Sequence, residues 1–302
     1  VLMIKDRMFG VVCAAITPMT DSEQIDYDSV KPFVEYLQEI GCDGLYPIGT
    51  TGESMVIEPE ERTKLAHAFA KANAGKTPLF LQCGDWNAHR VMENIKVAQD
   101  IGATGVGVML PAFFPCDDRA VEDYFSRILS TFPDYPIYLY NIPRNAANDL
   151  SVSVYERLLK AFPNCVGVKY SSPDMQRLQD YQRVGAPYGA GIMTGSEYMY
   201  FGSMALGACG CISGTCPAFP EAFMGLYPKF MSGDLEGARA HQALILETKR
   251  LIAGIPVVPF VKAILKKKGI IKSDACRSPI RRLTAQEYGK LDDIMTAYEA
   301  LL

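Results

Sequence analysis

A lysine closes one of the apolar runs of the sequence. Lys169 ends the run "CVGVK", so we expect its side chain at the end of a buried strand. Burial disfavours the charged ammonium and lowers the pKa of a lysine. A neutral amine can attack a carbonyl carbon and form a Schiff base. The alternative is a lysine that extends its ammonium to solvent or pairs with a carboxylate, and position alone leaves both interpretations open.

A tyrosine holds the equivalent place one apolar run earlier. Tyr140 ends "PIYLY", and a tyrosine beside a reactive lysine can carry protons while an imine forms and a carbon–carbon bond breaks. Tyr135 and Tyr138 lie nearby in the sequence. A core aromatic with a hydrogen-bonded hydroxyl is therefore the simpler interpretation of Tyr140.

Two threonines lie between two glycines in the stretch "YPIGTTGES". The hydroxyls and backbone N–H groups of Thr50 and Thr51 could cradle a carboxylate, because successive N–H groups in a turn form an anion-binding nest. The alternative is an ordinary loop that caps the next helix. Glu53 either braces this loop or is a favourable acid near a helix start.

The elements that must position these residues are short apolar runs alternating with amphipathic stretches. Most of the runs are apolar on both faces, which is typical of a parallel sheet covered by helices. Eight such units predict a (β/α)8 TIM barrel. A doubly wound open sheet would need a phosphate-binding glycine fingerprint after an early strand, which the sequence lacks. The eight runs are 11–19, 44–49, 78–84, 105–111, 136–143, 165–171, 190–197 and 208–215.

The strand pattern stops after Thr215, and four helical stretches follow. We therefore expect a catalytic barrel domain over 1–233 and a C-terminal helical extension over 234–302. No linker rich in Ser, Pro or Gly separates them, so the extension is expected to pack on the barrel. Barrel enzymes work at the carboxyl ends of their strands, where Lys169 and Tyr140 are expected to meet the threonine pair.

Composition excludes several classes of function. The formal net charge of -4 offers no basic patch for nucleic acid, and no apolar run is long enough to span a membrane. The first ten residues include charged side chains from Lys5 onward and no long apolar core, which argues against a signal peptide. Nine cysteines without a disulfide pattern favour a reducing cytoplasm. Cys209, Cys211 and Cys216 fit no zinc spacing, so we expect packing in a buried strand rather than a metal site.

The motifs together resemble the dihydrodipicolinate synthase / N-acetylneuraminate lyase family of class I aldolases. The matching segments run in order from about Phe9 to the C-terminal helices: "ITPM", "GTTGE", "YNIP", "GVK", "TGSE" and "CISGT". The resemblance implies an aldolase barrel with a three-helix extension, assembled as a homotetramer, a dimer of dimers. It also implies that Lys169 forms a Schiff base with pyruvate or another 2-oxo acid, with Tyr140 as proton relay.

The same resemblance assigns the rest of the pocket. Thr51 would hydrogen-bond Tyr140, and Thr50 and Thr51 would bind the substrate carboxylate. The backbone around Ile212 and the residues from Gly195 to Glu197 would line the remaining space. No metal or organic cofactor is implied, because the lysine does the covalent chemistry.

The sequence departs from the lysine-pathway synthases at two places. Their "YNVPSRTG" supplies an arginine for the second substrate, whereas "YNIPRNAAN" here has Arg144 one position early and Asn145 in the arginine's place. Their "PYY" tyrosine is replaced in "PAFFP" by Phe113 and Phe114, which cannot donate a hydroxyl proton. Glu197 could accept hydrogen bonds from a polyol chain, as a sugar-acid aldolase requires, or it could be a surface acid at a strand end.

The leading hypothesis is a class I aldolase or lyase that uses pyruvate or another 2-oxo acid. It either condenses this acid with an aldehyde or cleaves a larger 2-oxo (sugar) acid into these two parts. One alternative is dihydrodipicolinate synthase proper, and another is a sugar-acid dehydratase that uses the same imine. A third is a non-catalytic protein that binds a 2-oxo acid, because fold alone never proves catalysis. A metal-dependent aldolase is disfavoured, because no His/Asp/Glu ligand cluster ends the predicted strands.

Overall fold

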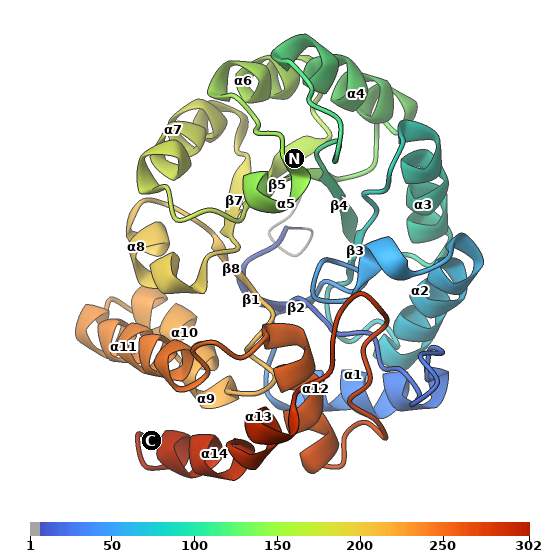
Figure 1. The fold of residues 1–302 in the computed structure, drawn as a ribbon. Coiled ribbons are helices and arrows are strands. Elements are labelled where there is room, and N and C mark those ends of the chain that lie inside the picture. Colours follow the sequence, from blue (N-terminus) through green and yellow to red (C-terminus); the bar gives the residue numbers. More distant parts are fainter. Residues whose placement is uncertain (1–6) are drawn as a thin grey trace. The chain divides into compact units, whose positions relative to one another are not determined.

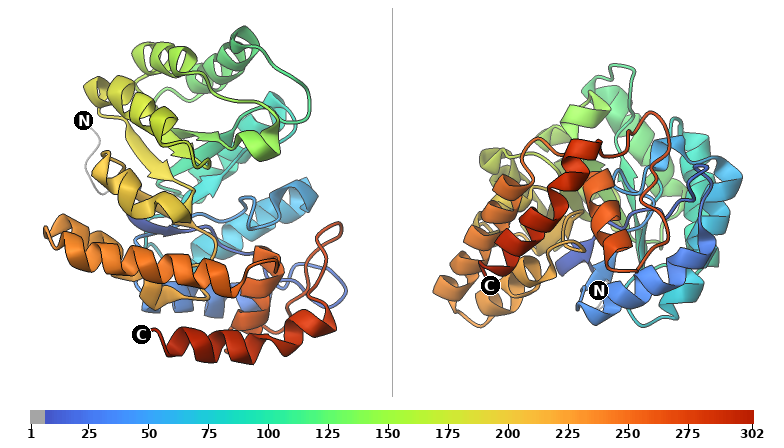
Figure 2. Two further views of the ribbon diagram at one scale, coloured as in Figure 1. Left: turned by 60° about the vertical axis from the view of Figure 1, so that its left-hand side comes forward. Right: turned by 60° about the horizontal axis from the view of Figure 1, so that its bottom comes forward.

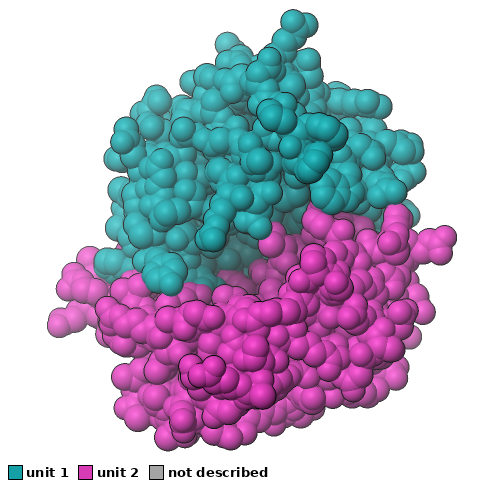
Figure 3. Space-filling view, viewed as in Figure 1, with its two compact units in different colours: residues 1–12, 43–46, 78–212 teal, residues 13–42, 47–77, 213–302 magenta. Residues whose placement is uncertain are grey.

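The computed structural model describes residues 7–302 of the chain. The prediction that the first ten residues are not a signal peptide therefore rests mainly on residues outside the described part. Two compact units are distinguished (Figure 3), and each is described by itself. Unit 1 comprises 1–12, 43–46 and 78–212, and unit 2 comprises 13–42, 47–77 and 213–302. The predicted division of the chain near Asp234 is a different partition and stays a prediction.

Unit 1 contains the sheet, apart from the last residues of its first and last strands. Eight parallel strands follow the order β2-β1-β8-β7-β6-β5-β4-β3. A parallel bridge between Leu45 and Leu79 joins the two ends of this order, so the sheet forms a nearly closed barrel (Figure 1). The predicted (β/α)8 barrel is confirmed. The strands are β1 (Gly10–Cys13), β2 (Gly44–Leu45), β3 (Phe80–Gln82), β4 (Gly105–Met109), β5 (Ile137–Asn141), β6 (Cys165–Tyr170), β7 (Gly191–Thr194) and β8 (Gly210–Ser213).

Every residue of these strands is buried, as the runs without alternation predict. Glycine is required where one strand passes a large side chain or another backbone. A Cβ at Gly107 in β4 would lie 1.9 Å from the hydroxyl oxygen of Tyr46. A Cβ at Gly167 in β6 would lie 2.0 Å from the carbonyl oxygen of Gly191 in β7. These glycines make room for the aromatic side chains of the barrel.

The helices of unit 1 follow the strands and lie outside them (Figures 1 and 2). Four of them start with a side-chain cap that accepts a backbone N–H from the first turn, at Asn87, Asp117, Ser151 and Asp174. The helices of this unit are α3 (Ala88–Asp100), α4 (Asp118–Thr131), α5 (Pro143–Ala146), α6 (Val152–Ala161), α7 (Met175–Gly185) and α8 (Tyr200–Ala205), with short 3-10 turns η4 (Ala186–Tyr188) and η5 (Glu197–Met199).

Unit 2 contains the remaining helices, and two predicted helices are each split in it. The stretch after 219 breaks at Gly225, because Pro228 has no N–H to donate to the carbonyl four residues earlier. The last stretch breaks between Gly289 and Leu291, where glycine weakens the helix. The elements are η2 (Tyr27–Ser29), α1 (Val30–Glu39), η3 (Ser54–Val56), α2 (Pro59–Asn73), α9 (Pro220–Met224), α10 (Leu226–Met231), α11 (Leu235–Leu251), α12 (Val257–Lys267), α13 (Ala285–Gly289) and α14 (Leu291–Glu299). None of the described helices has both the length and the apolar character needed to cross a membrane.

Candidate active site

The lysine singled out by the sequence lies inside unit 1. Lys169 is in β6, is 4% exposed and pairs in register with Tyr140 of β5. Its Nζ lies 3.9 Å from the ring centroid of Tyr140 and 4.4 Å from that of Tyr46. The side chain therefore does not extend to solvent, and among residues 7–302 it forms no ion pair with a carboxylate.

The two tyrosines form an aromatic corner around the ammonium. The rings of Tyr46 and Tyr140 meet edge to face with centroids 6.4 Å apart. The negative face of an aromatic ring attracts a cation, so both rings stabilise a charged Lys169 in a place with little water. The same charge acts on Cys211 of β8, where burial raises the thiol pKa to about 12 while Lys169 opposes the rise. Tyr46 was not predicted, although it closes the apolar segment just before the two threonines.

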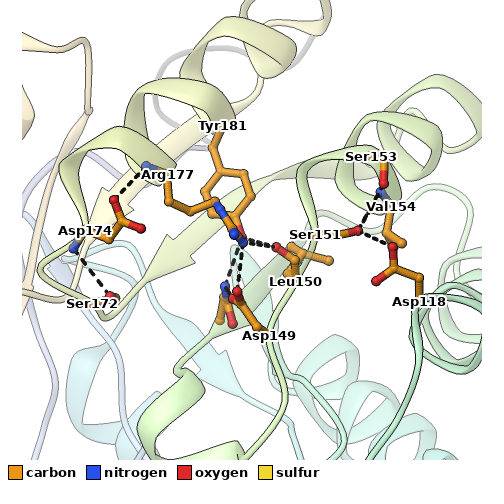
Figure 4. Close-up of polar contacts among 11 residues, drawn as sticks. Asp118, Asp149, Leu150, Ser151, Ser153, Val154, Ser172, Asp174, Arg177 and Tyr181 are labelled. Carbon is orange, nitrogen blue, oxygen red and sulfur yellow. Dashed lines mark hydrogen bonds and ion pairs between the residues drawn. The ribbon is translucent and has the colours of Figure 1, made fainter.

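A polar network holds the loop after β5. Asn141 directly follows Tyr140, and its Nδ2 donates to Asp149 Oδ1 at 2.7 Å and to the Tyr181 hydroxyl at 2.9 Å. Arg177 Nη1 donates to Asp149 Oδ2 at 2.8 Å and to the Leu150 carbonyl at 3.0 Å (Figure 4). The Tyr181 hydroxyl also donates to the Leu150 carbonyl, and burial raises its pKa.

These hydrogen bonds attach both ends of the ten-residue segment 141–150 to helix α7. The segment carries α5, which presents Arg144 and Asn145, both exposed. Arg177 and Tyr181 lie one helical turn apart in α7, so both side chains can face the loop. Arg177 and Tyr181 are positioning residues that were not predicted from the sequence, although the spacing of an arginine and a tyrosine in one helix was the available signal.

A pocket of about 260 Å³ lies where the segments after β5, β6 and β7 come together. It contains charges of both signs, Arg144 and Glu197, and Glu197 is only 8% exposed. The alternative of a surface acid is therefore wrong for Glu197. Asn145 does not line the pocket. The lining residues are Pro143, Arg144, Ser171, Ser172, Pro173, Gly195, Ser196, Glu197 and Tyr198.

Serine hydroxyls complete this pocket. Ser171 and Ser172 follow the strand of Lys169, and Ser196 precedes Glu197. Gly195 allows the close approach of two of these segments, because a Cβ there would lie 1.9 Å from Ser171 Oγ. The residues from Gly195 to Glu197 line this pocket, and their predicted contact with a substrate stays a prediction; Ser171 and Ser172 were not predicted. The sequence "KYSS" was their signal.

The remaining residues of unit 1 that the sequence singled out are Ile212, Phe113 and Phe114. Ile212 is in β8 and is 3% exposed, and its predicted part in the pocket stays a prediction. Phe113 and Phe114 are 74% and 71% exposed, with ring centroids 5.0 Å apart. Phe113 adopts a positive φ of 75°, a conformation that is strained for a bulky residue.

The threonine loop belongs to unit 2. Thr50 is exposed and Thr51 half-buried. Neither caps a helix: α2 starts with Glu58 in a capping box with Glu61, so the capping interpretation is wrong. The Thr17 hydroxyl donates to the Gly52 carbonyl at 2.6 Å and holds the turn. The expected meeting of Thr50 and Thr51 with Lys169 and Tyr140 stays a prediction.

Glu53 braces this loop from within unit 2. Lys262 of α12 donates from Nζ to Glu53 Oε1, and both side chains are 0% exposed. The Arg277 N–H donates to Glu53 Oε2 at 2.7 Å, and Lys262 also donates to the Ala275 carbonyl at 2.7 Å. Glu53 itself adopts the left-handed conformation, with φ at 62°. Bracing is therefore the correct interpretation of Glu53, and Lys262 and Arg277 are positioning residues that the sequence did not reveal.

Arg277 extends the brace to the start of α2. Its guanidinium donates to both carboxylate oxygens of Glu61, at 2.6 and 2.9 Å, and to the Glu23 and Val56 carbonyls. This cation lowers the pKa of Glu61, whose carboxylate in turn raises the pKa of Arg277. The segment from 53 to 61 is thus held at both ends by C-terminal residues of the same unit.

The cysteines group differently from the prediction. Cys211 is buried in β8 and Cys209 is half-buried before it, as expected for packing in a strand. Cys216 instead lies with Cys13 and Cys42, all three in unit 2. The predicted absence of a catalytic metal or organic cofactor stays a prediction.

Comparison with known proteins gives the family. Residues 7–298 match the model of the dihydrodipicolinate synthetase family. A 4-hydroxy-tetrahydrodipicolinate synthase of Sorangium cellulosum is 33% identical over 273 residues, which cover 90% of this chain and 89% of that protein. An uncharacterized DapA-like lyase of Halobacterium salinarum is 29% identical over 285 residues, covering 94% and 92%.

Solved structures agree on the fold. Dihydrodipicolinate synthase from Aquifex aeolicus superposes with a TM-score of 0.91 at 25% identity, covering 98% of this chain and 99% of that one. The sialic acid aldolase of Ruminococcus gnavus also reaches 0.91, at 23% identity and 97% coverage of both chains. The predicted homotetramer is not decided by these similarities. The chain belongs to the dihydrodipicolinate synthetase family, whose members are lyases and aldolases.

Proposed function

We propose that this chain is a class I aldolase or lyase that forms a Schiff base between Lys169 and pyruvate or another 2-oxo acid. The observation that carries the proposal is the buried ammonium of Lys169, held at 3.9 Å from the ring centroid of Tyr140 on the neighbouring strand. The neutral amine of such a lysine is the nucleophile that attacks the carbonyl carbon of a 2-oxo acid.

The covalent step follows from this arrangement. Nζ attacks C2 of the 2-oxo acid, and the carbonyl oxygen leaves as water, so that a carbon–nitrogen double bond forms. In the cleavage direction, the imine accepts the electron pair of the C3–C4 bond, while the C4 hydroxyl loses its proton and becomes an aldehyde. The resulting enamine takes a proton at C3, and water then releases pyruvate. In this proposal Tyr140 carries these protons, and its place beside Lys169 in the sheet supports that role.

The two ends of the substrate are bound differently in this proposal. Thr50 and Thr51 are the groups that we propose for the carboxylate that all 2-oxo acids share. The pocket with Arg144, Glu197 and the serine hydroxyls takes the part that varies between substrates. A buried carboxylate and several hydroxyls suit a polyhydroxylated chain, and an arginine suits a second anionic group. These features favour a 2-oxo sugar acid.

Borohydride trapping tests the covalent step. Reduction in the presence of pyruvate is expected to add one pyruvate-derived group per chain, located on Lys169 by peptide mass spectrometry. Lys169→Ala is expected to lose the adduct. The matched control is Lys160→Ala, which removes an exposed lysine at the end of α6 in the same unit. An adduct that persists in Lys169→Ala, or a wild-type protein that is not labelled, contradicts the proposal.

A substrate screen separates the remaining alternatives. Release of pyruvate from a sugar acid identifies an aldolase, whereas a 2-oxo acid of unchanged carbon number identifies a dehydratase. Turnover of pyruvate with aspartate semialdehyde identifies the reaction of the synthases named above. Trapping without any turnover supports a non-catalytic 2-oxo-acid-binding protein.

A further inference from the structure

Three cysteine thiols from distant parts of the sequence meet inside unit 2. Cys13 ends β1, Cys42 follows α1, and Cys216 follows β8. Their sulfur atoms all lie within 4.8 Å of one another. Cys13 and Cys216 are 0% exposed and Cys42 is 7% exposed. We call these three residues the thiol cluster.

The thiols of the cluster interact with one another. Hydrogen bonds from Cys13 and Cys216 lower the pKa of Cys42, because two S–H donors stabilise its thiolate. Burial raises the pKa of Cys13 and of Cys216. The Cys216 thiol also lies 3.5 Å from the Ser213 carbonyl oxygen. The three sulfur atoms thus lie close enough together to share one ion.

We propose that the thiol cluster binds one soft metal ion through three sulfur atoms, and that monovalent copper is the ion it fits. Thiolates select soft ions such as Cu(I) and Zn(II). Zinc is almost always four-coordinate in a structural site, and the group within the described residues contains only three potential ligands. Monovalent copper is satisfied by three sulfurs. It also needs no water ligand, for which this buried position offers little room.

Charge is the second reason to propose a monovalent ion. The coordinating cysteine must lose its proton, so binding releases protons to the solvent. A single thiolate balances the charge of a monovalent ion, so that no net charge is buried. Each further thiol that ionises adds a buried negative charge, which is costly in an apolar environment.

An ion in this place would fix chain segments that contact the threonine loop. Cys13 is four residues before Thr17, whose hydroxyl holds the Gly52 carbonyl. Cys216 is two residues after Gly214, where a Cβ would lie 2.7 Å from Thr51 Oγ1. The thiol cluster thus joins the two segments that contact this loop, all within unit 2. The metal would act on stability and loop order and would take no part in the imine chemistry.

Titration with Cu(I) tests the proposal. The reduced chain is titrated anaerobically against a chromophoric Cu(I) chelator, and the bound ion is examined by X-ray absorption. We expect one copper per chain with three sulfur neighbours. Cys13→Ser, Cys42→Ser and Cys216→Ser are each expected to weaken binding by about 100-fold, because loss of even an outer-shell partner of a metal costs about 10–100-fold. Copper should also raise the melting temperature of the wild type, because a ligand of the folded state stabilises it.

Matched controls remove cysteines outside the cluster. Cys165→Ser removes a buried thiol of β6, and Cys116→Ser removes a more exposed one; both are expected to leave copper binding unchanged. If a serine variant of a fully buried position fails to fold, Cys42→Ala replaces it, because Cys42 is the most exposed of the three. Binding that survives in Cys42→Ser and Cys42→Ala overturns the proposal. So does a loss in Cys116→Ser, or a wild type with no stoichiometric copper.

Discussion

Lys262→Met tests how strongly the C-terminal helix α12 holds the threonine loop through Glu53. The substitution keeps a long side chain but removes the ammonium that pairs with Glu53. Both partners are 0% exposed, so the substitution leaves the Glu53 carboxyl group buried without its ammonium partner. Glu53 also accepts a hydrogen bond from the Arg277 N–H at 2.7 Å. This bond only partly compensates the loss of the ammonium.

The expected magnitude follows from this burial. Breaking a buried ion pair by removing one partner costs about 3–5 kcal/mol. Replacing both charges at once leaves no buried charge, and such a change is often nearly neutral. Lys262→Met should therefore lower the free energy of unfolding by about 3–5 kcal/mol. The double variant Lys262→Met/Glu53→Gln should recover most of that loss.

Equilibrium urea unfolding followed by far-ultraviolet circular dichroism measures these differences. The control is Lys267→Met in the same helix, whose amine pairs with Asp292 while the two side chains are 50% and 74% exposed. An exposed pair contributes little, so this control should change stability by less than about 1 kcal/mol. A Lys262→Met protein as stable as the control, or a double variant no more stable than Lys262→Met, would refute the reasoning.

The remaining predictions concern the site and one buried lysine. Thr51→Val should lose most turnover while folding normally; near-normal turnover by kcat/KM removes the loop from the mechanism. Tyr140→Phe should slow imine formation by about 100-fold or more, measured as the rate of borohydride-trappable adduct, because general acid–base groups contribute that much. Glu197→Gln should raise KM for sugar acids and leave pyruvate trapping unchanged. Burial lowers the pKa of Lys249 from 10.5 to about 8, so the folded state binds fewer protons between these values and its stability rises with pH across them. Lys249→Met should therefore be more stable than wild type by about 3 kcal/mol at pH 7, a gain that disappears towards pH 10.5 in urea unfolding.

The parts of the molecule that depend on local pattern could be predicted from the sequence. Runs that are apolar on both faces gave the strands, and the position of Lys169 and Tyr140 at the ends of two runs predicted that they are neighbours. The helix breaks at Pro228 and Gly289 were missed, because the amphipathic pattern continues across them. Weighing the missing N–H of proline against that pattern would have placed the first break.

The contacts that depend on distant segments could not be predicted in the same way. Glu53 and Lys262 are 209 residues apart, and nothing local in either segment specifies the other. The same holds for Cys13 and Cys216, which the sequence assigned to separate strands. The sequence also could not show whether Glu197 is exposed or buried, because its burial depends on the neighbouring loops. Burial of charge is a property of the fold, and it separates these alternatives.

Gly107 has a consequence for how this protein can change over time. It contributes no side-chain atom, yet a Cβ there would overlap the hydroxyl of Tyr46, whose ring faces Lys169. Any other residue at this position would displace that ring, and through it the lysine two strands away. In a library of random variants selected for activity, position 107 should be depleted of substitutions about as strongly as position 169. Genetic intolerance at a position is therefore no evidence, in this barrel, that the residue takes part in the chemistry.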